Sequence, residues 1–250
     1  MTPDQIYLLA GAAGILPAVF WLFFWLKQDK IKPDPSRVIL GAFLLGAVSA
    51  LFMIPVQSIL IKSQYFIAIP LVITFALSFT EEIAKYISVK LSSLKDIAND
   101  EIIDPTIYMI TAALGFAALE NTLYMINFLA DLSLIESFIN GGKRFVGATL
   151  VHVVCSALVG FALSFTYYKK KSIRRLWVVL AMSLAGIVHT TFNYFVSTSN
   201  GDFERYGFYF IWLMVLIVLV VFQILKKMNR RYELPDRNLF GGEKKSVRQG

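Results

Sequence analysis

Polar side chains that could perform chemistry lie inside four otherwise apolar stretches of this 250-residue chain. Four residues advance an α-helix by about 400°, so residues four apart lie about 40° from each other on one face. Each stretch holds one such pair: Glu81 and Lys85, Phe116 and Glu120, His152 and Ser156, and His189 and Asn193. Four helices could therefore present these pairs to one shared interior.

Carboxyl and imidazole groups in an apolar interior carry out general acid–base chemistry, relay protons or bind metal ions. Glu81, Glu82 and Glu120 would together cost about 8–10 kcal/mol to insert without compensation. That cost is comparable with the stability of a whole domain. A single buried histidine or a Glu–Lys pair is commonly structural, but three carboxyls with both histidines of the chain, His152 and His189, favour a functional site.

The elements that carry these residues are predicted to be membrane-spanning helices. Hydrophobic residues make up 57% of the chain, charged residues 16%, and the mean hydropathy is +0.63. This composition excludes a disordered chain, a soluble globular enzyme and a coiled coil. Backbone groups in lipid must bond within their own segment, and the alternation of a membrane barrel is absent. Seven stretches are long enough to span a bilayer: Ile6–Leu26, Val38–Ile61, Ile67–Lys90, Thr106–Asp131, Arg144–Tyr168, Leu176–Thr198 and Phe208–Leu225.

The distribution of Lys and Arg predicts the orientation of this all-α bundle. The segments after spans one, three, five and seven carry 19 of these residues and the opposite side carries 4. Because cytoplasmic loops are enriched in Lys and Arg, we expect the N-terminus outside and the C-terminus in the cytoplasm. Basic residues follow the first span instead of preceding it, so we interpret it as an anchor and not a cleaved signal peptide. The net charge of +7 is then an orientation signal that also contacts anionic lipids, and nucleic-acid binding is not expected.

The chain is predicted to form one integral-membrane domain over residues 1–227, with a catalytic core over 68–196. Residues 228–250 are polar and are expected to form a disordered cytoplasmic tail. Spans one, two and seven hold no ionisable residue in their interiors, so we expect them to act as packing. The single cysteine excludes a disulfide framework.

Four motifs in this order resemble a known family. They are E-E-x-x-K at Glu81, Glu82 and Lys85, F-x-x-x-E-N at Phe116, Glu120 and Asn121, H-x-x-x-S at His152 and Ser156, and H-x-x-x-N at His189 and Asn193. Together they resemble the PrsW family of intramembrane proteases, which is similar to the type II CAAX prenyl endopeptidases and bacteriocin-processing proteins. The resemblance covers about residues 68–196. It implies a multi-pass protein of the bacterial cytoplasmic membrane that hydrolyses a peptide bond in a membrane-associated or membrane-proximal substrate, such as an anti-sigma-factor-like regulator.

The resemblance also implies roles for individual residues. Glu81 is the expected general base, and His189 with Asn193 is expected to stabilise the oxyanion. The CAAX relatives carry histidine where this chain has Glu120, so the resemblance does not fix the role of that residue. Two carboxyls in one low-dielectric site tend to share a proton, so Glu81 could accept a proton while Glu120 donates one. Glu82 and His152 complete the candidate catalytic set, and the supporting residues are Lys85, Phe116, Asn121, Arg144 and Ser156. Lys85 could neutralise Glu82 and fix the helix face.

A zinc site is the alternative to this glutamate-type chemistry. Glu120, His152 and His189 would make a His2Glu ligand set and leave Glu81 as the base. The H-E-x-x-H signature is absent, so the spacing does not favour zinc. No cofactor is therefore favoured, and zinc stays open because ligands can come from separate helices.

Two other functions and one other mechanism compete with the glutamate-type protease. A proton-coupled transporter would use the buried glutamates and histidines as a relay, although the chain shows no repeated halves. A catalytically silent scaffold of the same fold would bind partner helices. A cysteine protease would pair Cys155 with His152, but buried thiols in lipid are usually inert. The sequence does not set the oligomeric state.

Depth in the membrane gives a structural test of the shared site. At 1.5 Å per residue, Glu120, His152 and His189 lie roughly 10–13 Å below the outer boundary. Glu81 reaches a similar depth, about 16 Å, only if its helix begins near Pro70, a residue favoured in the first helical turn. We therefore predict that this helix begins there and that the cavity opens toward the outer half of the membrane.

Overall fold

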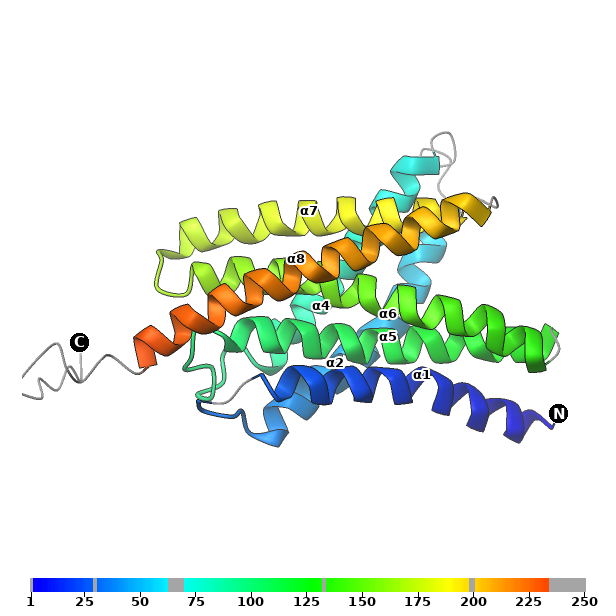
Figure 1. The fold of residues 1–250 in the computed structure, drawn as a ribbon, viewed down its shortest axis with the longest axis horizontal. Coiled ribbons are helices and arrows are strands. Elements are labelled where there is room, and N and C mark those ends of the chain that lie inside the picture. Colours follow the sequence, from blue (N-terminus) through cyan, green and yellow to red (C-terminus); the bar gives the residue numbers. More distant parts are fainter. Residues whose placement is uncertain (1, 29–30, 63–69, 132–133, 198–200, 234–250) are drawn as a thin grey trace, which may run out of the picture.

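The computed structural model describes residues 2–28, 31–62, 70–131, 134–197 and 201–233, and these residues form helices and no strands (Figure 1). The side chains of residues 130–145 are outside this description. The helices are α1 (Pro3–Leu26), α2 (Ser36–Lys62), α4 (Pro70–Ser92), α5 (Asp104–Asp131), α6 (Leu134–Phe165), α7 (Lys171–Ser197) and α8 (Gly201–Glu233). They confirm the predicted helical bundle.

Six of these helices are long and apolar enough to cross a membrane, so the chain is a multi-pass membrane protein. The remaining helix, α4, is 23 residues long and could extend about 35 Å. Its apolar sequence is interrupted by Glu81, Glu82, Lys85 and Lys90, and it is the one described helix outside the six. The charged residues of the first motif therefore need partners inside the bundle.

Two helices extend furthest beyond their predicted spans. The helix α6 begins at Leu134, ten residues before the predicted Arg144. The helix α8 runs from Gly201 to Glu233 and so continues past residue 228, where the polar tail was expected to start. The prediction followed apolar character, whereas polar residues near the membrane surface continue both helices. Residues 234–250 of the predicted tail lie outside the described residues.

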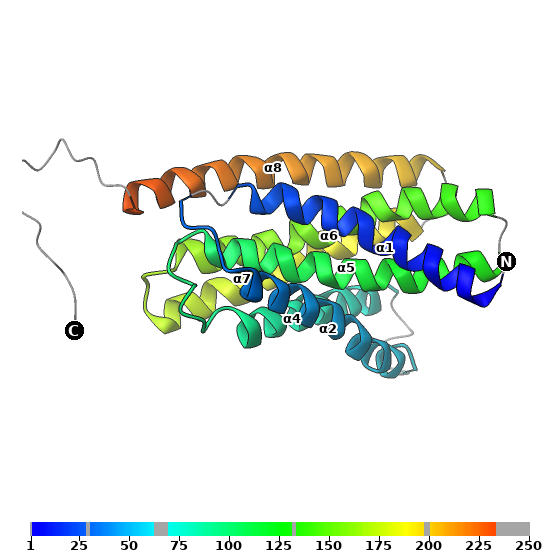
Figure 2. The same cartoon turned by 90° about the horizontal axis from the view of Figure 1, so that it is seen from below.

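The helix α5 lies at the centre of the bundle and packs against α1, α2, α4 and α6 (Figures 1 and 2). Small residues allow this packing. A Cβ atom on Gly115 of α5 would collide with the carbonyl oxygen of Phe43 on α2, and a Cβ atom on Gly46 of α2 would collide with the carbonyl oxygen of Ala112. Backbones approach this closely in membranes only where side chains are absent or small. This contact holds the part of α5 that carries the second of the four motifs beside α2.

The four motif helices are neighbours in space. The helix α4 packs on α2 and α7 and also touches α5 and α6, while α6 packs on α5 and α7. The helix α8 covers α6 and α7 from outside. In Figure 1, α8 crosses this face of the bundle obliquely. This arrangement encloses the inward faces of α4, α5, α6 and α7.

A second buried polar group ties the loop before α5 to distant parts of the chain. We call it the loop clasp and define it as Asp34, Glu101, Asp104, Tyr108 and Asn229. Asn229 of α8 accepts a hydrogen bond from the backbone of residue 102 at 3.0 Å and donates one to Glu101 at 2.8 Å. The Tyr108 hydroxyl donates to Asp34. The clasp therefore fixes one end of the bundle, away from the motifs.

Candidate active site

The helix α4 presents one polar face to the bundle interior. Ser78, Glu81, Glu82 and Lys85 are all buried, and their spacing of three and four residues places them on one side of the helix. The described part of this helix begins at Pro70 and residues 63–69 lie outside the described residues, so the predicted helix start stays a prediction. The contacts of Glu81 and Glu82 with His189 place the first motif level with that histidine.

Glu82 is the most heavily bonded carboxylate of the site. Its Oε1 atom accepts from Lys85 Nζ at 2.5 Å and lies 3.1 Å from His189 Nδ1. Its Oε2 atom accepts from the Ser156 hydroxyl at 3.3 Å. Both side chains of the Glu82–Lys85 pair are fully buried. The sequence pairing of Glu81 with Lys85 is thus replaced by a pair three residues apart, and the prediction that Lys85 neutralises Glu82 is confirmed.

His152 has a partner on each ring nitrogen. Lys85 Nζ lies 3.0 Å from Nδ1, and Glu120 Oε2 lies 2.7 Å from Nε2. An ammonium group has no lone pair, so Lys85 donates to Nδ1 and the Nε2–H group donates to Glu120. The ring also packs against Phe116, with 5.2 Å between ring centroids. These contacts fix the tautomer of His152 and hold Glu120 at the edge of the site.

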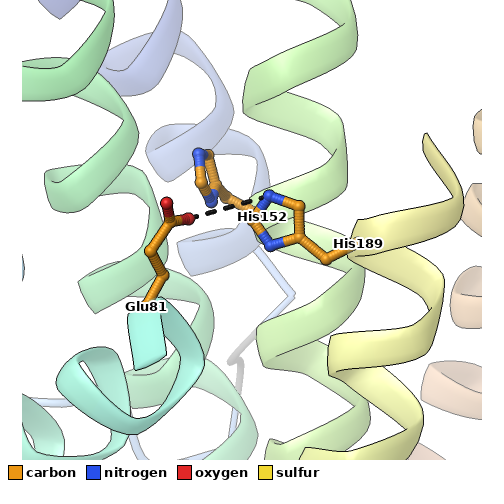
Figure 3. A group of neighbouring side chains, drawn as sticks. All are labelled: Glu81, His152 and His189. Atoms are coloured by element: carbon orange, nitrogen blue, oxygen red, sulfur yellow. Dashed lines mark ion pairs between the residues drawn. The ribbon is translucent and has the colours of Figure 1, made fainter. Parts of the chain in front are cut away.

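Glu81 and His189 face each other across the centre of the site (Figure 3). The distance between Glu81 Oε2 and His189 Nε2 is 3.7 Å. Glu81 Oε1 accepts from the Gln57 side-chain amide at 2.7 Å. Glu81 Oε2 is buried and has no hydrogen-bond partner among the described residues. One carboxylate oxygen is therefore anchored while the other points toward an imidazole nitrogen.

The two histidines bring α6 and α7 together at this point. Their rings meet edge to face with centroids 5.0 Å apart, and Figure 3 shows them converging with Glu81 from three different helices. A distance above 10 Å from Glu81 to both rings would have contradicted a shared site. The observed geometry instead gathers the predicted carboxyl and imidazole groups.

The remaining predicted residues occupy the surroundings of this centre. Asn193 donates to the Ser78 hydroxyl at 3.4 Å, and Asn121 donates to Thr149 at 3.0 Å. Lys85 Nζ lies 5.1 Å from the ring centroid of Phe116. The side chain of Arg144 lies outside the described residues, so its predicted supporting role has no structural test here.

The interpretation of α2 as packing alone is wrong, because Gln57 comes from this helix and contacts Glu81. Gln57 carries no charge, so it is not among the ionisable residues that indicate a site within the spans. The one sequence signal is an amide side chain within an otherwise apolar segment, the same kind of anomaly that identified Asn193. A glutamine within an apolar span can thus indicate a functional site, as an ionisable residue does.

A cavity of about 410 Å³ adjoins the site between α2 and α5. Gln57 and Glu120 are part of its wall, so it touches the partners of both Glu81 and His152. The other lining residues are mostly apolar: Ala50, Met53, Ile54, Phe116, Leu123, Tyr124, Ile126 and Asn127. It lies in the half of the bundle that carries the N-terminus, which the predicted orientation places outside.

The residues of the site also fit a divalent metal. Ligand atoms of Glu81, His152 and His189 all lie within 4.8 Å of one another, and Glu81 Oε2 is a buried oxygen that receives no hydrogen bond from the part of the chain that the structure describes. Two histidines and one glutamate are a ligand set of catalytic zinc. The expected set with Glu120 is not the one that the described residues gather, because Glu120 bonds to the Nε2 side of His152. Metal binding would require His152 to release Lys85 or Glu120.

Cys155 does not have the surroundings of a nucleophile. It is buried, and its thiol donates to the backbone oxygen of Ala185 at 3.3 Å. His152, the base that a cysteine protease would need, holds Lys85 and Glu120 on its two nitrogens. A second group of potential metal ligands combines Cys155 with Glu82 and His189, but Glu82 already has three partners.

Comparison with known proteins places the chain in a family. The model of the family described as "PrsW family intramembrane metalloprotease" matches residues 34–221, a wider range than the predicted 68–196. The chain is 22% identical to Protease PrsW of Bacillus subtilis (strain 168) over 84% of this chain and 88% of that protein. It is 24% identical to Protease PrsW of Clostridioides difficile (strain 630) over 90% and 88%, and 26% identical to Protease PrsW of Halalkalibacterium halodurans over 72% and 80%.

No solved structure matches this chain. The family match includes α2 and all four helices that carry the motifs, and it extends well into α8. With the gathered glutamates and histidines inside a multi-pass helical bundle, the chain belongs to the PrsW family of intramembrane proteases.

Proposed function

We propose that this chain is an endopeptidase of the bacterial cytoplasmic membrane that cleaves a membrane-associated protein, with Glu81 as the general base. The observation that carries the proposal is the buried Oε2 atom of Glu81, which has no hydrogen-bond partner among the described residues and lies 3.7 Å from His189 Nε2. A buried carboxylate oxygen without a donor costs free energy. Such a cost is expected where the oxygen must remain available for a reacting molecule.

Water activation falls to Glu81 in this mechanism. Gln57 holds Oε1, and Oε2 accepts the proton of a water molecule as that molecule attacks the peptide carbonyl. A positioned general base contributes about 10²–10⁴-fold to a rate. The neighbouring Glu82 is unsuited to this task because Lys85, Ser156 and His189 already occupy its oxygens.

The negative charge that develops on the substrate oxygen needs hydrogen-bond donors. Glu82 accepts a hydrogen bond from His189 Nδ1–H at 3.1 Å, so His189 Nε2, which faces the reacting centre, donates to the substrate oxygen when the ring carries both of its protons. Asn193 lies one turn further along α7 and supplies an amide donor, which the Ser78 hydroxyl orients. Preorganised donors of this kind cost no reorganisation at the moment of reaction.

The leaving amine takes the proton that Glu81 accepted, which regenerates the carboxylate. We assign Glu120 a role other than sharing a proton with Glu81, because Glu120 accepts a hydrogen bond from His152 Nε2–H. We assign Glu120 and Lys85 the task of fixing the His152 ring from both sides. His152 in turn packs against His189 and limits its rotation.

Zinc is the second mechanistic candidate, on the observation that Glu81, His152 and His189 gather three ligand atoms within 4.8 Å. Bound there, zinc would polarise the peptide carbonyl and acidify water. Glu81 would then serve as a ligand. We favour the glutamate-type site because the Lys85 ammonium lies 3.0 Å from His152 and would repel a cation.

The cavity between α2 and α5 supports a protein substrate that arrives from the membrane. Its wall is mostly apolar and it adjoins Gln57 and Glu120. An apolar side chain of an unwound peptide segment suits such a space better than a charged one. An anti-sigma-factor-like membrane regulator is one protein of this class.

The test compares membrane proteomes of cells that contain the intact protein with those that contain Glu81→Gln. A protease predicts a full-length membrane protein that accumulates in the variant and a fragment that appears only with the intact protein. Glu101→Gln is the matched control, because it replaces another buried carboxylate outside the site. Identical proteomes would contradict the proposal, and proton-coupled flux in liposomes would favour the transporter.

Metal dependence is then measured on the purified protein with the identified substrate. A glutamate-type site predicts that cleavage survives exhaustive chelation. Loss of cleavage on chelation, restored by stoichiometric zinc, would instead assign Glu81, His152 and His189 as ligands.

A further inference from the structure

Gln57 lies at the boundary between the cavity and the site. It is half-buried on α2, while its neighbours Ile54, Val56 and Ile59 are exposed on the outer surface of the helix. Its side chain is part of the cavity wall, and its amide nitrogen lies 2.7 Å from Glu81 Oε1. Gln57 therefore connects α2 to the first motif through a hydrogen bond.

The two adjacent glutamates of α4 differ in the kind of donor that each receives. Glu82 accepts from the charged Lys85 ammonium, whereas Glu81 Oε1 accepts from the neutral Gln57 amide. A cation beside a carboxylate neutralises it, while an amide fixes its direction and leaves its charge in place. Gln57 can therefore orient Glu81 without removing its capacity to accept a proton.

The hydrogen bond also selects which oxygen of Glu81 is available. With Oε1 held by Gln57, rotation of the carboxylate is restricted and Oε2 remains on the side of His189. A reacting group works best when its neighbours hold it within a narrow range of orientations. Without the amide, both oxygens could turn toward the cavity or toward Lys85.

We propose that Gln57 is a positioning residue for the reaction, acting through Glu81 from a helix that carries none of the four motifs. This inference rests on the proposed general-base role of Glu81. It assigns to α2 a part in catalysis in addition to its packing against α5.

The first test is spectroscopic and needs no substrate. Infrared difference spectra of wild type and Glu81→Gln in detergent isolate the carboxyl bands of Glu81. In Gln57→Leu, these bands should shift, because a carboxylate oxygen has lost its amide donor. Gln223→Leu is the matched control, since Gln223 is exposed on α8 and the substitution changes hydropathy equally.

The second test uses the substrate identified with the Glu81→Gln comparison. Gln57→Leu should lower kcat by about 10–100-fold, the range found when supporting residues around an active site are removed. KM should change little, because the cavity keeps its apolar wall. A rise in KM alone would assign Gln57 to substrate binding and overturn a positioning role.

The substitution Gln57→Glu is conservative, so the variant should still fold. It also predicts the direction in which pH changes the rate of cleavage. Its carboxyl group donates to Glu81 only while it carries a proton, and two ionised carboxylates would repel each other. Cleavage by Gln57→Glu should therefore fall as pH rises through a range in which wild type retains activity. A Gln57→Glu profile parallel to wild type would contradict the inference.

The outcomes separate this inference from the proposed function. Unchanged Glu81 bands in Gln57→Leu, or an unchanged kcat, overturn the positioning role even if Glu81→Gln is inactive. Shifted bands support the contact, and if wild type then cleaves nothing, the failure belongs to the proposed protease.

Discussion

The site and the loop clasp are both buried polar groups, but their carboxylates have different partners. In the clasp, Glu101 accepts from the backbone nitrogen of Lys32, and Asp104 accepts from the backbone nitrogens of residues 100 and 101. In the site, Glu81 and Glu82 accept hydrogen bonds from the side chains of Gln57, Lys85 and Ser156. The clasp binds chain segments together, whereas the site binds reactive groups to one another.

This difference distinguishes carboxylates that are buried to stabilise the fold from carboxylates that are buried to perform chemistry. A carboxylate that satisfies backbone N–H groups lowers the cost of an irregular loop, because those donors would otherwise lack partners. A carboxylate whose hydrogen bonds come from lysine, histidine and glutamine side chains satisfies no backbone donor of an irregular loop. Substitutions in the clasp should therefore act on stability, and substitutions in the site should act chiefly on chemistry.

The largest expected effect is on activity, from Glu81→Gln. The variant removes the general base and should lower kcat/KM by about 10²–10⁴-fold. Thermal unfolding in detergent should stay close to wild type, because glutamine can still pair with Gln57. A variant that loses activity only in proportion to its loss of folded protein would place Glu81 with the clasp residues.

Lys85→Met should combine both kinds of effect. Removing the cation leaves Glu82 buried without its closest partner and should destabilise the protein by about 3–5 kcal/mol. Unfolding in detergent measures this change. Adding Glu82→Gln to Lys85→Met should restore part of the stability, because the uncompensated charge is then gone. Full additivity of the two substitutions would show that the pair is not coupled.

Asn229→Ala should affect stability alone. It removes the acceptor for the backbone of residue 102 and the donor to Glu101, at a cost of about 1–3 kcal/mol. Cleavage per folded molecule, measured with the identified substrate, should match wild type. A fall in kcat at full folding would mean that the clasp also transmits geometry to the site.

The smallest effect is expected beside the clasp, where Arg37 pairs with Asp96 at 2.7 Å and 3.0 Å. The hydrogen bond from Arg37 lowers the pKa of Asp96. A lowered folded-state pKa contributes stability above the ordinary pKa of aspartate, and that stability is lost as pH falls through the folded value. The unfolding temperatures of wild type and Arg37→Ala should differ slightly at neutral pH and converge in acid. Screening by solvent keeps this difference small.

The sequence was sufficient to predict the spans, the helical fold and most of the residues that the structure brings together. Length and apolar character predicted the helices, and the cost of burying charge singled out Glu81, Glu82, His152 and His189. Spacing placed the members of each pair on one helix face. These inferences succeed because they depend on the geometry of one helix and on the cost of placing its charged groups in lipid. Both can be judged from the sequence of that helix alone.

The partners that come from different helices depend on how the helices pack. Spacing within a helix cannot tell that Lys85 also bonds His152, or that Glu120 bonds His152. Those contacts depend on how each helix is rotated about its axis, which interhelical packing fixes through sites such as Gly46 and Gly115. Gln57 reaches Glu81 for the same reason, since only the packing of α2 against α4 and α5 brings an uncharged amide to the carboxylate.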